Sequence, residues 1–142
     1  MFTITSIVIV TLIKNVGKPT FIFTDFLHFI LPFTPLKHLI TLAKYYKVSL
    51  DYLTGLSDKK DIFFNYVTLD KEEIGQKIIY IRNLNNLKQR ELAKVLNTSP
   101  STICAYEKGN TLILTAFLYQ IAKEFNVSMD WFVGASTRIK RI

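Results

Sequence analysis

Apolar side chains between residues 70 and 134 recur at the spacing of amphipathic helices, and residues that begin or end helices separate the runs. The segment 71–84 carries three isoleucines on one helical face: Ile74, Ile78 and Ile81. Asp70 precedes this segment as a suitable N-cap, and Glu73 stands three residues later, as in a capping box. The pattern predicts a helix over 71–84.

The segment 87–109 predicts two short helices joined by a tight turn. The first, over 89–96, places Leu92, Ala93 and Leu96 on one face. Asn97 follows, and asparagine tolerates the left-handed backbone conformation of a sharp turn. Ser99 is a preferred N-cap, and proline is favoured at the first helical position, where Pro100 stands. The sequence therefore predicts a second helix that begins at residue 100.

This second helix has a buried face and a face of small residues. Ile103 and Tyr106 can point inward, which leaves Ser101, Thr102 and Ala105 outward. A helix-turn-helix presents its second helix to the DNA major groove in this way. The segment 87–109 is thus a candidate DNA-reading unit.

Part of the chain is repeated. Residues 39–55 align without a gap on 118–134, with seven identities in seventeen positions. In each segment a helix that contains Ala-Lys is followed by a short helix with a serine N-cap, Ser49 or Ser128. An aspartate follows two positions later, near the positive end of that helix. Tyr52 and Trp131 occupy equivalent places, and we expect both to be core aromatics.

Residues 74–134 resemble the DNA-binding domain of the Cro/phage-repressor family, also called the XRE type. The motifs that carry the resemblance are Gln89 with Glu91-Leu92-Ala93, Ser101-Thr102-Ile103, Tyr106-Glu107-Lys108-Gly109 and Val127-Ser128-Met129-Asp130-Trp131-Phe132. The resemblance implies an all-α fold with a five-helix domain over 70–136. Residues 35–57 resemble the last two helices of the same domain, and nothing in 1–34 matches its first half. The N-terminal repeat therefore looks truncated.

The resemblance also implies roles for individual residues. Gln89 would anchor a phosphate, Lys88 would add charge, and Lys108 and Asn110 would meet backbone phosphates after the recognition helix. The residues implied to face the base edges are Ser99, Pro100, Ser101, Thr102 and Ala105. Arg82 and Glu107 are implied to form a structural ion pair. Because the recognition side chains are short, we expect poor bidentate base readout and some reliance on DNA shape.

Charge and composition narrow the function further. The formal net charge is +7, and residues 74–142 carry +6 of it, from ten Lys/Arg and four Asp/Glu. A basic surplus on the helix-turn-helix segment suits phosphate binding. The single cysteine excludes an internal disulfide and fits a cytoplasmic protein. Histidine spacing indicates no metal site, and no motif indicates a cofactor or an enzyme.

The expected organisation is an apolar segment of unassigned structure (1–34), a partial repressor-like helix pair (35–57), a linker (58–69), the DNA-binding domain (70–136) and a basic tail (137–142). The apolar runs in 1–34 are too short to span a membrane, and we predict no signal peptide. The sequence predicts a repressor-like transcriptional regulator that binds double-stranded DNA as a homodimer. The alternative is a protein-interaction module, such as an antitoxin or a decayed regulator, with the N-terminal half as its contact surface. A membrane-associated regulator is a third and less favoured interpretation.

Overall fold

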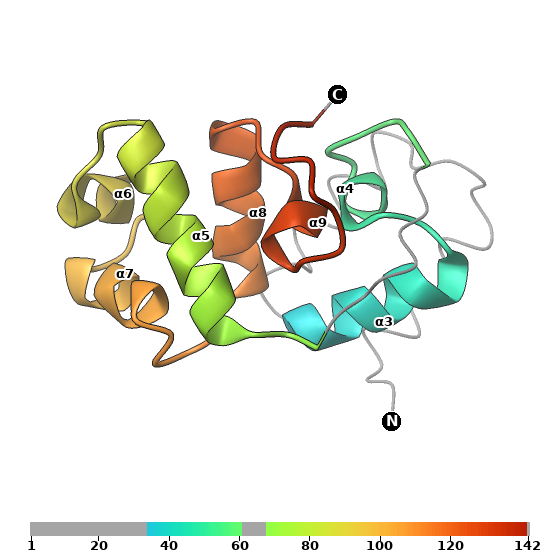
Figure 1. Cartoon of the computed structure of the whole chain (residues 1–142), viewed down its shortest axis with the longest axis horizontal. Coiled ribbons are helices and arrows are strands. Elements are labelled where there is room, and N and C mark those ends of the chain that lie inside the picture. The colour runs from blue at the N-terminus through green and yellow to red at the C-terminus, as the bar shows by residue number, and fades with distance from the viewer. Residues whose placement is uncertain (1–33, 61–67, 142) are drawn as a thin grey trace.

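The computed structural model describes residues 34–60 and 68–141. These residues form seven helices and no strand, which confirms the all-α fold. The helices, labelled as in Figure 1, are α3 (Leu36–Tyr46), α4 (Leu50–Leu53), α5 (Lys71–Leu84), α6 (Gln89–Val95), α7 (Pro100–Glu107), α8 (Thr115–Glu124) and α9 (Met129–Phe132). Helices α5 to α9 are the five predicted for the DNA-binding domain. No helix in the described ranges is long and apolar enough to cross a membrane. The predictions for residues 1–33 and for 61–67 of the linker lie outside the described residues.

Helix α5 has the predicted bounds, and its three isoleucines are all buried. The Asp70 carboxylate accepts hydrogen bonds from the backbone N–H groups of Glu72 and Glu73, as an N-cap does. Glu73 does not form the reciprocal hydrogen bond that a capping box would require. Its carboxylate instead pairs with Lys77 one turn later, at 2.6 Å, because an i,i+4 cation competes for it.

Gly75 allows α5 to pack closely on α7. A Cβ atom at this position would lie 2.5 Å from the carbonyl oxygen of Tyr106 and 2.7 Å from that of Glu107. Both neighbours are backbone atoms of α7, so neither can rotate away. Helix α7 therefore sits at its present depth only because residue 75 has no side chain.

We expect Gly75→Ala to destabilise the protein by about 1–3 kcal/mol, as overpacking of a tight contact does. The higher helix propensity of alanine, worth about 1 kcal/mol, would oppose this effect without cancelling it. Urea denaturation followed by circular dichroism measures the change. The exposed neighbour Gln76→Ala serves as the control, because it alters propensity without a clash. A Gly75→Ala protein that is as stable as this control would contradict the packing described here.

Helices α3 and α4 lie at the end of the molecule opposite α6 and α7 (Figure 1). Their apolar residues join the same hydrophobic core as the five-helix unit, and Leu39, Leu42, Leu50 and Leu53 are buried. Helix α4 packs against α9, its counterpart in the repeat. The 35–57 segment is therefore an integral part of one core.

The basic tail is attached to the core. Lys140 forms an isolated antiparallel bridge with Val127, and the Ser128 N–H donates to the Ile139 carbonyl at 2.8 Å. The Arg141 guanidinium donates to the carbonyl oxygens of Leu56, at 2.8 Å, and Ala122, at 3.2 Å. These bonds hold the tail against α8, the α8–α9 connection and the segment that follows α4.

Candidate nucleic-acid interface

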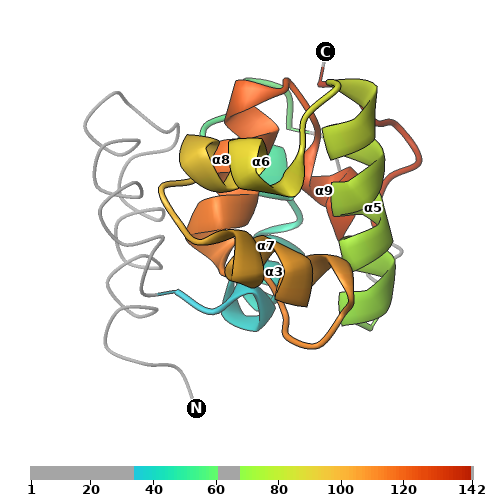
Figure 2. The same ribbon diagram turned by 90° about the vertical axis from the view of Figure 1, so that its left-hand side faces the viewer.

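Helices α6 and α7 pack together and form the predicted helix-turn-helix (Figure 2). Asn97 adopts the left-handed conformation, with φ of 52°, directly after Leu96, the C-cap of α6. The Ser99 hydroxyl then caps α7 by accepting from the N–H of Thr102, and Pro100 is the first helical residue. Leu92 and Ile103 are almost completely buried at 1% exposure each. The turn chemistry and both buried faces confirm the sequence prediction for this unit.

The outer face of α7 carries small, mostly polar side chains, and some of them hydrogen-bond to each other. Ser101 is exposed, and Thr102 and Ala105 are partly exposed. The Ser99 hydroxyl lies 2.8 Å from the Ser101 hydroxyl and 2.8 Å from that of Thr102. These hydroxyl groups are short, and their hydrogen bonds to each other hold them close to the helix. This surface can approach a groove closely but has no long side chain that could reach a base edge.

A buried polar network fixes α7 against α5. The Arg82 Nε donates to Glu107 Oε1 at 2.5 Å, and a second guanidinium nitrogen lies 3.3 Å from Glu107 Oε2. The Arg82 guanidinium also donates to the Leu87 carbonyl at 2.9 Å. The Glu107 side chain is only 4% exposed and the Arg82 side chain 15% exposed. The predicted structural ion pair is present, and it is largely buried.

Gln89 extends this network. Its amide nitrogen donates to Glu107 Oε2 at 2.6 Å, which directs the side chain inward from the start of α6. Sequence reasoning predicted an outward phosphate contact for Gln89 and did not foresee this bond. An amide group has two N–H donors, so one remains for a phosphate once Glu107 has taken the other. The phosphate role therefore stays a prediction.

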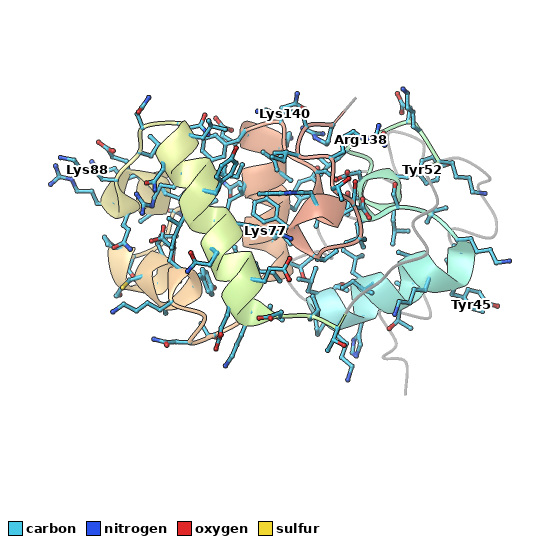
Figure 3. The ribbon with its side chains drawn as sticks, viewed as in Figure 1. Tyr45, Tyr52, Lys77, Lys88, Arg138 and Lys140 are labelled. Carbon is cyan, nitrogen blue, oxygen red and sulfur yellow. The ribbon has the colours of Figure 1, made fainter. Side chains whose placement is uncertain are left out.

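Several basic or polar residues around the α6–α7 unit are exposed. These are Lys88, Arg90, Lys94, Lys108 and Asn110. Figure 3 shows Lys88 projecting from the end of the molecule where α6 lies. The nearby carboxylate of Glu91 accepts from the Lys88 backbone N–H at 2.6 Å, and Glu107 is paired with Arg82. The surface around α7 therefore has a positive balance, as a phosphate-binding surface requires.

The two repeat aromatics are less buried than expected. Tyr52 and Trp131 are both partly buried and pack against the edge of the core. The Lys77 ammonium lies 5.3 Å from the Trp131 ring centroid and donates to the Trp131 carbonyl at 2.8 Å. Aromatic rings of this size commonly keep one edge in water. Their role in the fold is to cover the core.

The fold and the α6–α7 unit define a helix-turn-helix protein. A family model described as helix-turn-helix matches residues 78–132. The repressor protein CI of Enterobacteria phage phi80 is 34% identical over 68 residues, which are 48% of this chain and 28% of that repressor. An uncharacterized HTH-type transcriptional regulator of Methanocaldococcus jannaschii is 43% identical over 54 residues, 38% of this chain and 82% of that protein. The chain thus spans less than a third of the phage repressor it matches. It belongs to the Cro/phage-repressor (XRE) type of helix-turn-helix proteins.

Proposed function

We propose that this protein is a cytoplasmic DNA-binding transcriptional regulator of the repressor type, with α7 as its recognition helix. The observation that carries the proposal is the buried Arg82–Glu107–Gln89 network, which holds α7 in place beneath a surface of exposed cations. A rigid helix flanked by phosphate-binding groups is what major-groove docking needs. The relatives that are named a repressor and a transcriptional regulator support the same function.

The proposed division of work follows the positions of the residues. Lys88, Lys108 and Asn110, with the free N–H of Gln89, contact phosphates on either side of the groove. The first turn of α7 and Ala105 meet the base edges. Apolar contact of Pro100 or Ala105 with thymine methyl groups gives a modest preference, and DNA shape supplies the rest. Binding is therefore strongly salt-dependent and only moderately selective.

An electrophoretic shift series on the DNA upstream of its own gene, at several salt concentrations, tests this function. We expect Lys108→Ala to weaken binding to all sequences about equally and to reduce the salt slope by about 1, because one phosphate contact is lost. Lys37→Ala is the matched control, since Lys37 is an exposed lysine of α3, outside the helix-turn-helix unit. Equal salt slopes for the two variants would contradict the proposed interface.

A second candidate function is a protein-interaction module with weak DNA specificity, such as an antitoxin. The short, mutually bonded hydroxyls of α7 favour it, because they leave little for direct readout. The same titration separates the two functions. Ser101→Ala should change the DNA sequence preference if α7 reads DNA. It should leave DNA binding unchanged if α7 contacts a protein.

A further inference from the structure

The contact between α4 and α9 is reciprocal. Asp130 Oδ1 accepts from the Leu50 N–H at 2.8 Å, and Asp51 Oδ1 accepts from the Met129 N–H at 2.8 Å. Leu50 and Met129 occupy the same place in the aligned segments 39–55 and 118–134, as do the two aspartates. The two hydrogen bonds are therefore equivalent by the repeat. Each aspartate stabilises the N-terminus of the other helix.

Equivalent residues in the two segments also share their backbone geometry. Lys47 and Asn126 both have φ of 54°, at the end of the preceding helix. Gly55 and Gly134 have φ of 76° and 82° after the short helix. Each short helix is capped by its serine, which accepts the N–H of residue 52 or 131. Two similar surfaces thus face each other and exchange the same bond, as in an interface with two-fold symmetry.

Two further contacts strengthen this surface, although neither has a counterpart among the described residues at the equivalent position of the other segment. The Ser128 hydroxyl donates to Asp51 Oδ2 at 2.6 Å, and the Asp51 N–H donates to Asp130 Oδ2 at 3.0 Å. Both carboxylates are therefore bonded through both oxygens, in a region where Asp130 is completely buried. Arg141 closes the edge by donating to the Leu56 carbonyl, whose equivalent in the second segment is the carbonyl of Ala135.

We infer that the α9 surface of the helix-turn-helix unit is self-complementary and can pair with a second copy of this chain, and that α4 occupies this surface within the chain. In such a pair, the Asp130 carboxylate of each copy would accept the Met129 N–H of the other. The bond made at present by Asp51 shows that α9 can donate in this way. Within the chain, residues 35–57 bind the α9 surface in place of the second copy.

The linker to α5 determines whether α4 or a second chain binds the α9 surface. Residues 35–57 are joined to α5 through a short linker, so their effective concentration at α9 is on the order of millimolar. A second chain at micromolar concentration cannot compete. The full chain is therefore monomeric with respect to this surface and carries one recognition helix.

Equivalent substitutions in the full chain test the inference. Asp51→Ala weakens the α4 contact and leaves the α9 surface intact, whereas Asp130→Ala weakens the contact and also removes the group that would join two α9 surfaces. By sedimentation equilibrium we expect one chain for the wild type, a concentration-dependent shift to two chains for Asp51→Ala, and one chain for Asp130→Ala. Circular dichroism checks that both variants fold. Equal association states for the two variants, or a wild type that pairs through α9, would overturn the inference.

Discussion

Arg82→Ala is expected to lower the free energy of unfolding by about 3 kcal/mol or more. The substitution leaves the Glu107 carboxylate, 4% exposed, without its cationic partner, and a stranded buried charge costs about 3–5 kcal/mol. The Leu87 carbonyl loses its guanidinium donor as well. The hydrogen bond from Gln89 remains, but it does not supply a charge. Thermal and urea denaturation of the full chain measure this loss.

A second ion pair on the same helix provides the control. Glu73 and Lys77 also pair through α5, but the Glu73 side chain is 52% exposed, so Glu73→Ala should cost less than about 1 kcal/mol. A double-mutant cycle with Arg82→Ala and Glu107→Gln should show strong coupling, because the two groups share one buried network. A coupling energy close to zero would mean that Arg82 and Glu107 do not orient α7.

The stability contribution of Asp130 should decrease as the pH rises from about 4 to about 7. Burial, followed by the adjacent Asp51 carboxylate, raises the pKa of Asp130 from 3.8 to about 7 in the folded protein. The folded state then binds a proton that the unfolded chain has released, so this group favours folding in acid and loses that contribution as the pH passes about 7. A rise of the pKa from 3.8 to about 7 corresponds to a loss of as much as about 4 kcal/mol in the free energy of unfolding above pH 7.

Asp130→Asn isolates this effect, because asparagine resembles the protonated acid. Its oxygen keeps one of the two backbone N–H bonds that Asp130 accepts, and its amide can donate toward the Asp51 carboxylate. The other backbone bond is lost at every pH, so it does not contribute to the pH dependence. We expect the difference in unfolding free energy between wild type and Asp130→Asn to change with pH in this window, in favour of the variant at pH 8. The exposed acid Asp58, changed to asparagine, should leave the profile unchanged. Parallel profiles for wild type and Asp130→Asn would show that Asp130 does not titrate there.

Local signals made much of the fold predictable from the sequence. The starts of α5, α7 and α9 follow from Asp70, Ser99 and Ser128, because an N-cap acts through N–H groups two or three residues away. The ion pair of Arg82 was also predictable, although its burial was not. The family resemblance identified Glu107 as the partner of Arg82. The burial of the pair depends on how α5, α6 and α7 pack together.

Apart from the pairing of Glu73 with Lys77 one turn away, the contacts that sequence reasoning missed are long-range. Asp51 and Asp130 were assigned to the positive ends of their own helices, and the structure places each at the helix of the other segment. Both placements satisfy a helix end equally well, so local chemistry cannot choose between them. Gln89 is similar, since a long side chain at the start of α6 can reach either inward or outward. The repetition of Ser-x-Asp in both segments was the one available signal for the first contact.

A nuclear magnetic resonance titration of the full chain with a short DNA duplex locates the DNA-binding surface residue by residue. We expect the backbone amide signals of Gln89, Ser101, Thr102 and Lys108 to shift on addition of DNA, while those of α3 and α4, at the opposite end of the molecule, do not. The shifts should diminish as salt is added. Shifts centred on α3 and α4, or none around α7, would contradict the assignment of α7 as the DNA-reading helix.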